Sequence, residues 1–135
     1  MPIPDTLLLA VCALSADMPA ARVAETLAKG VRAAGMGEPD LCPIEDGPPA
    51  GFNERMRSAR AVVLGAERLD PTTLAGSDVF EIATRARQAG VPAYAVTGAN
   101  ELDAFGARML DLQVILEVHT LRGLAAAGTK LARSA

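Results

Sequence analysis

Short apolar segments of strand length alternate with helical segments along the chain, and this alternation limits the fold more than any other feature. Residues 6–13 (TLLLAVCA) form a continuous apolar run, which is typical of a strand buried on both faces. Further strands are predicted at residues 40–44, 61–65, 93–97 and 113–118. Strands that alternate with helices indicate a mostly parallel sheet with helices on both faces. We therefore expect an α/β fold, a Rossmann-like three-layer sandwich with about five strands.

Helical patterns occupy the intervals between these runs. In residues 19–34 an apolar side chain recurs at every fourth position, at Val23, Leu27 and Val31. Asp17 is the expected N-cap of this helix, and Gly35 is its expected stop. Other helices are predicted at residues 52–59, 79–89, 104–110 and 120–133, and the helix at 79–89 is expected to stop at Gly90. The last one carries an apolar stripe that would pack on the sheet or, alternatively, on a second copy, at Leu121, Leu124, Gly128 and Leu131.

The composition favours a single globular domain over residues 1–135. Half of the residues are hydrophobic and 21% are charged, which is enough apolar material for a core. A net charge of −3 without a polybasic run argues against nucleic acid as a partner. The apolar start, residues 7–11, is far shorter than the roughly 20 residues that a membrane span needs, so we expect no membrane partner.

The cysteines and the histidine point to a cytoplasmic protein without a metal centre. Cys12 and Cys42 lack CxxC spacing, so we expect free thiols in a reducing compartment. The chain begins with Pro2, Pro4 and Asp5 instead of the charged n-region of a secretory signal. His119 is the only histidine and has no cysteine or second histidine at ligand spacing, so no metal site is predicted.

Residues 62–76 (VVLGAERLDPTTLAG) carry the largest group of charged and hydroxyl side chains at the end of a predicted strand. In open α/β sheets, ligands bind beyond the carboxyl ends of the strands. In the loop expected after this strand, Arg68 could hold a phosphate or carboxylate, and Asp70 is the candidate catalytic base. The other candidate ligand-binding residues are Ser15, Asp46, Glu67, Thr72 and Thr73. The same edge would also collect Asp17, Glu45, Thr97, Asn100 and His119.

A simpler interpretation of this loop is structural. The run Asp70-Pro71-Thr72-Thr73 is also typical of a helix entry, with Asp70 as the cap and Arg68 solvated or paired with Glu67. The sequence contains no P-loop, no GxGxxG after the first strand and no GxSxG elbow, so no strong nucleotide or nucleophile motif supports catalysis.

Two segments, taken in order, resemble the type I glycerate kinase family, whose members phosphorylate glycerate with MgATP. Residues 6–47 are similar to the family's opening strand, its loop and helix, and the strand that ends in an ADGGEGT-like loop. Residues 61–98 are similar to the later VITGEGRLDxQTxxGK segment and GVPVIAIAG strand, here VVLGAERLDPTTLAG and GVPAYAVTG. The resemblance implies the family's first, Rossmann-like domain.

The chain departs from the family pattern in the loops to which the resemblance would assign a function. A lysine of the family's first loop aligns with Ser15, which cannot supply its charge. Of the ADGGEGT-like loop only Asp46 and Gly47 remain, and Pro48 and Pro49 follow them without N–H donors. The family's second domain is missing between the two segments, so a dimer mate would be one way to close the site.

Three functions remain open at this stage. The first is a degenerate, non-catalytic glycerate-kinase-like domain that binds a small anionic ligand or a protein partner. The second is a reduced but active kinase of glycerate or a related hydroxy acid, which would need MgATP, with Mg²⁺ held by Glu45, Asp46 or Glu67. The third is a structural or interaction protein whose loop residues only cap helices.

Overall fold

The computed structural model describes residues 5–135 and contains a sheet of five parallel strands, as the sequence predicted. The strand order is β2-β1-β3-β4-β5, which reverses direction between β1 and β3. In this class of doubly wound sheet the reversal marks the crevice where ligands bind. The strands are β1 (Leu7–Val11), β2 (Asp40–Leu41), β3 (Ala61–Leu69), β4 (Ala93–Asn100) and β5 (Leu112–Glu117).

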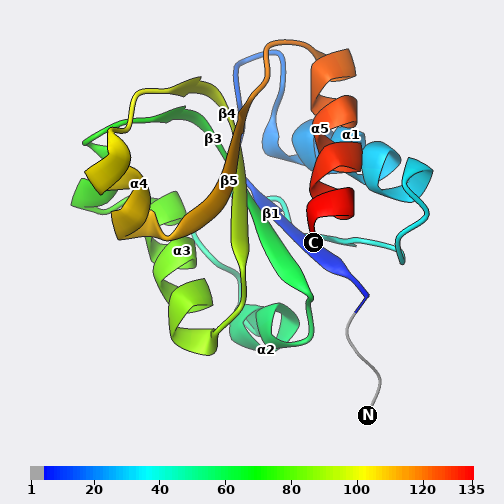
Figure 1. The fold of residues 1–135 in the computed structure, drawn as a ribbon, viewed down its shortest axis with the longest axis horizontal. Coiled ribbons are helices and arrows are strands. Elements are labelled where there is room, and N and C mark those ends of the chain that lie inside the picture. The colour runs from blue at the N-terminus through cyan, green and yellow to red at the C-terminus, as the bar shows by residue number, and fades with distance from the viewer. Residues whose placement is uncertain (1–4) are drawn as a thin grey trace.

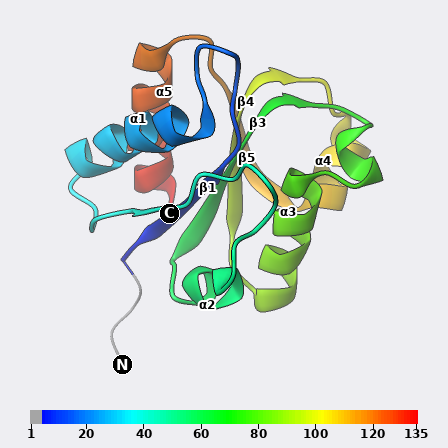
Figure 2. The same ribbon diagram turned by 180° about the vertical axis from the view of Figure 1, so that it is seen from behind.

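Helices cover both faces of this sheet, so the predicted α/β sandwich is confirmed. One layer holds α1 and α5, and the opposite layer holds α2, α3 and α4 (Figure 1; Figure 2). The helices are α1 (Ala20–Ala33), α2 (Phe52–Arg57), α3 (Asp78–Ala89), α4 (Ala104–Leu110) and α5 (Leu121–Ser134), with a short 3₁₀ helix, η1 (Thr73–Ala75). In residues 5–135 no helix combines the length and the apolar content that crossing a membrane would require.

Alternate side chains of the buried strands supply two separate cores. From β1, Leu7, Leu9 and Val11 pack toward α1 and α5. The intervening Leu8 and Ala10 pack with α2 and α3 on the other face. A strand that must be apolar on both faces reads as a continuous apolar run, which explains why this strand was visible in the sequence.

Two predicted helix stops are confirmed, and one predicted cap is wrong. Gly35 and Gly90 follow α1 and α3 with φ of 82° and 71°, which glycine adopts without strain. Asp17 does not cap α1, because residues 15–18 close a tight turn through the Met18 N–H and the Ser15 carbonyl oxygen (3.1 Å). The helix begins after Pro19, whose side chain makes no capping hydrogen bond.

Strands β3 and β4 extend further than the sequence predicted. β3 continues to Leu69 and β4 to Asn100, and the two pair with each other beyond the end of β1. Glu67 and Arg68 therefore lie on a strand and not in a loop, which corrects the expectation for these two residues. The cause is the pairing of Arg68 with Ala99 and of Leu69 with Asn100, a contact between segments about 30 residues apart.

The helices α1 and α5 touch backbone to backbone, because each has a glycine at the contact. A Cβ on Gly30 would lie 1.9 Å from the Ala125 carbonyl oxygen, and one on Gly128 would lie 2.3 Å from the Leu27 carbonyl oxygen. The Thr129 hydroxyl also donates to the Gly30 carbonyl oxygen at 2.9 Å. The last helix therefore packs within this chain, on α1 and the sheet. This is the first of the two alternatives that the sequence left open for its apolar stripe.

Gly30→Ala should lower the free energy of unfolding by about 1–3 kcal/mol, because the added methyl group forces the two backbones apart. This is the opposite of the roughly 1 kcal/mol gain that alanine brings in an unconstrained helix. Chemical denaturation measures the difference. Gly123→Ala in α5 is the control, since its Cβ would meet only the Thr120 hydroxyl at 3.2 Å. A Gly30→Ala protein as stable as the parent would show that the close contact is not real.

Candidate functional site

Asp70, the candidate base, is held by its own turn at the end of β3. Its Oδ1 accepts hydrogen bonds from the Thr72 N–H (2.9 Å), the Thr72 hydroxyl and the Thr73 N–H (3.3 Å). The Asp70 N–H in turn donates to the Thr73 hydroxyl oxygen at 3.1 Å. These reciprocal bonds cap the turn that leads into η1, so the capping role that the sequence suggested for Asp70 is confirmed.

The same hydrogen bonds set the charge state of Asp70. The Thr72 hydroxyl, followed by the N–H groups of Thr72 and Thr73 and by the charge of Arg68, lowers the pKa of the Asp70 carboxyl below its ordinary value. A lower pKa makes the carboxylate a weaker proton acceptor near neutral pH. The geometry therefore favours Asp70 as a cap over Asp70 as a general base.

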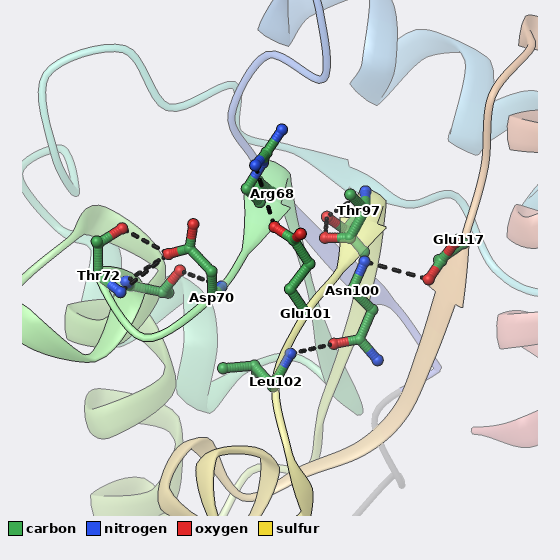
Figure 3. Close-up of polar contacts among 10 residues, drawn as sticks. Arg68, Asp70, Thr72, Thr97, Asn100, Glu101, Leu102 and Glu117 are labelled. Carbon is green, nitrogen blue, oxygen red and sulfur yellow. Dashed lines mark hydrogen bonds and ion pairs between the residues drawn. The ribbon is translucent and has the colours of Figure 1, made fainter.

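Arg68 lies on β3 and pairs with Glu101 at the end of β4, not with Glu67 as the sequence suggested. Its Nη1 lies 3.1 Å from the Glu101 Oε1, and both side chains are more than half exposed. Figure 3 shows the Arg68 side chain turned toward Glu101 and the Asp70 carboxylate turned toward Thr72. An ion pair as exposed as this one contributes at most about 1 kcal/mol, so an anion could compete for the guanidinium at small cost.

The neighbouring end of β4 is tied to its surroundings by polar contacts (Figure 3). The Thr97 side chain is fully buried and its hydroxyl donates to the Ala99 carbonyl oxygen at 3.2 Å. The Asn100 N–H donates to a Glu117 carboxylate oxygen on β5, and the Asn100 side chain accepts from the Leu102 N–H. These contacts hold the extension of β3 and β4 in place. Thr97 and Asn100 therefore use their polar groups in hydrogen bonds within the fold.

Within residues 5–135 no hydrogen bond or ion pair joins Glu45 or Asp46 to Arg68 or Asp70. Glu45 and Asp46 are exposed in the loop after β2. Among residues 5–135 no three histidine, cysteine, aspartate or glutamate side chains are arranged to hold a metal ion. The Mg²⁺ ligands that an active kinase would draw from Glu45, Asp46 or Glu67 therefore do not form a cluster in the described part of the chain.

Cys12, at the end of β1, is not poised for chemistry. Burial is the main factor that raises the pKa of its thiol to about 11, and the charge of Asp78 at the start of α3 adds to it. The thiol is therefore protonated at neutral pH, whereas nucleophilic cysteines act as thiolates. Cys42 is buried, and both cysteines are free thiols, as expected.

An open cavity of about 810 Å³ lies at the carboxyl edge of the sheet, on the α1 and α5 side. Its walls are the turn between β1 and α1, Gly98 at the end of β4, and the connection between β5 and α5. A Cβ on Gly98 would lie 2.9 Å from the Glu67 carbonyl oxygen, so only glycine lets β4 approach β3 this closely. The polar side chains that line the cavity are Ser15, Asp17, Arg22, His119 and Thr120.

The cavity is lined by charges of both signs. The Arg22 guanidinium contributes positive charge. The first turn of α1 adds to it, because no hydrogen-bond acceptor in residues 5–135 takes up the N–H groups of Ala20, Ala21 and Arg22, of which only Arg22 lines the cavity. Asp17 opposes this charge from the turn. Thr120 is engaged differently, since its hydroxyl oxygen accepts from the Gly123 N–H at 3.0 Å and caps α5.

Of the residues that the sequence predicted at the carboxyl edge of the sheet, Ser15, Asp17 and His119 line this cavity. Sequence reasoning missed Arg22, which lies in the first turn of α1. Glu67 and Arg68 lie on β3, Asp70, Thr72 and Thr73 follow it, and none of the five lines the cavity. Their roles as ligand contacts stay predictions. A basic residue in the first turn after a buried strand was the one signal in the sequence that pointed to Arg22.

Known proteins resemble the chain at two levels. The glycerate kinase family model matches residues 48–125, which include the resembling segment 61–98 but not the earlier segment 6–47. No curated protein matches. A solved structure from Burkholderia pseudomallei, described as a pilus assembly-related protein, is 16% identical with a TM-score of 0.55, over 98% of this chain and 93% of that one. At this identity the likeness concerns the fold alone.

Asp70→Ala should lower the melting temperature and speed hydrogen exchange at the amides of Thr72 and Thr73, because it removes their acceptor. The pKa of Asp70 is lowered in the folded protein, so its stabilising effect is complete above the ordinary aspartate value, about 3.9, and is lost as the pH falls through the lower folded value. The melting temperatures of parent and variant should therefore converge in acid. Equal melting temperatures at neutral pH would contradict the capping role.

Proposed function

The chain belongs to the glycerate kinase family, and from this premise we propose that it is a degenerate, non-catalytic member that binds a small anionic ligand. The cavity between the starts of α1 and α5 carries this proposal, because it combines Arg22, His119 and free helix N–H groups at the edge where sheets of this class bind ligands. A phosphate or carboxylate would receive hydrogen bonds from the N–H groups and a charge-assisted bond from Arg22.

The state of the catalytic candidates supports the loss of phosphoryl transfer. Asp70 is engaged in capping and its pKa is lowered, so it is poorly placed to take a proton from a hydroxyl. Ser15 stands where the family's first loop has a lysine, and Pro48 and Pro49 stand in the other resembling loop. The positive charge of the cavity comes from Arg22 on the helix instead.

A protein partner is the second candidate, favoured by one surface. Phe105 and Met109 are 63% and 42% exposed and stand four residues apart on α4, one helical turn, so together they would offer an apolar contact. Helix α4 lies in the layer opposite α1 and α5 (Figure 1), whose first turns line the cavity. The anion and partner functions would therefore occupy different parts of the molecule.

Arg22→Ala should weaken the binding of inorganic phosphate and of D-glycerate by about tenfold or more, because it removes a charge-assisted hydrogen bond. Isothermal titration calorimetry measures this. Lys29→Ala is the matched control, since it removes one positive charge from an exposed position two turns along the same helix. Arg68→Ala tests the site expected from the sequence. An affinity lost only in Arg68→Ala would move the site to the β3–β4 extension and overturn the proposal.

No ADP release above the Asp70→Asn background is expected when the purified protein is mixed with MgATP and D-glycerate. The variant keeps an oxygen acceptor at position 70 and loses the negative charge. Turnover in the parent that disappears in Asp70→Asn would contradict the proposal and establish the reduced kinase instead.

A further inference from the structure

We propose that the ligand of this cavity is an organic anion with an apolar body, whose apolar part rests on Leu121 and its neighbours; this rests on the proposed anion-binding function. The first reason is size. A volume of about 810 Å³ falls in the range of small-molecule pockets, roughly 300–1,000 Å³, and is far more than one phosphate group fills.

The second reason is the chemistry of the walls. Beside the polar residues the cavity is lined by Leu14, Met18, Val118 and Leu121. Leu14 and Val118 are buried and belong to the core under α1 and α5, so they form the floor. Ligand pockets combine such apolar walls with a few polar groups that fix the orientation of the ligand.

Leu121 is the residue that best supports an apolar contact with the ligand, because it does not contribute to either core cluster. The sequence placed it on the apolar stripe of the last helix with Leu124 and Leu131. Both of these leucines are buried in the core, whereas Leu121 is half-buried and contacts neither of the two core clusters. As the first residue of α5 it stands at the rim of the cavity.

The two halves of the cavity define the class of ligand. Arg22 and the first N–H groups of α1 would hold the phosphate or carboxylate, and Leu121 with Met18 would cover an aryl or short alkyl group. An anion without the apolar group would use only the first half, and a neutral molecule with the same apolar group would use only the second. Apolar area that the ligand buries beside the anchor is removed from water and therefore adds to the affinity.

Calorimetric titration with phenyl phosphate, inorganic phosphate and phenol tests this inference. Phenyl phosphate should bind at least tenfold more tightly than inorganic phosphate, and phenol should bind more weakly than either. Benzoate, in a parallel titration, shows whether the anchor prefers phosphate or carboxylate. Leu121→Ser should remove most of the advantage of phenyl phosphate and leave inorganic phosphate unchanged, because the serine keeps the backbone N–H groups and Arg22 in place.

Leu74→Ser is the matched control: Leu74 is a half-buried leucine on η1, outside the cavity. Circular dichroism establishes that each variant is folded. Equal affinities for phenyl phosphate and inorganic phosphate, both reduced by Arg22→Ala, would overturn the apolar half and leave the anion-binding proposal standing. Failure of every anion to bind would overturn both.

Discussion

The backbone contact between α1 and α5 is the constraint on which the candidate site depends. Two helices with ordinary side chains at the crossing would be held further apart, whereas Gly30 and Gly128 let the carbonyl oxygen of each partner approach. Because both helices follow parallel strands, their first turns lie at the same edge of the sheet. The close crossing therefore sets the spacing between Arg22 and the β5–α5 connection, and with it the shape of the cavity.

The positive charge of the candidate site comes from a different residue than the resemblance to the family would suggest. In the family that the chain resembles, the first loop carries a lysine, and here Ser15 takes its place. Arg22, in the first turn of α1, lines the same cavity as Ser15. In our account the cation of the candidate site is therefore Arg22 on α1, where the resemblance would place a lysine in the preceding loop.

The layers of the fold could be predicted from the sequence because each buried strand is apolar on both faces and each helix is apolar on one. The glycine stops at Gly35 and Gly90 were also visible, since a positive φ favours glycine. Local patterns failed where partners from distant segments decide the structure. Glu67 and Arg68 read as loop residues, and only the pairing of Arg68 with Ala99 makes them part of β3.

The candidate site was less predictable than the fold for the same reason. Asp70 could be recognised as a cap because its partners are two and three residues away. The cavity joins residues 14–22, 98 and 118–121, and no local pattern connects these segments. Leu121 illustrates the limit, because its spacing fits the buried stripe while its place at the first position of α5 puts it above the core.

The most direct test of the central claim is a titration with inorganic phosphate followed in ¹H–¹⁵N correlation spectra of the labelled protein. The account predicts concentration-dependent shifts at the amides of Ser15, Arg22, Gly98 and Thr120, which line the cavity, and at Ala20 and Ala21 in the first turn of α1. Shifts confined to residues 67–73, or the absence of shifts at the first turn of α1, would contradict it.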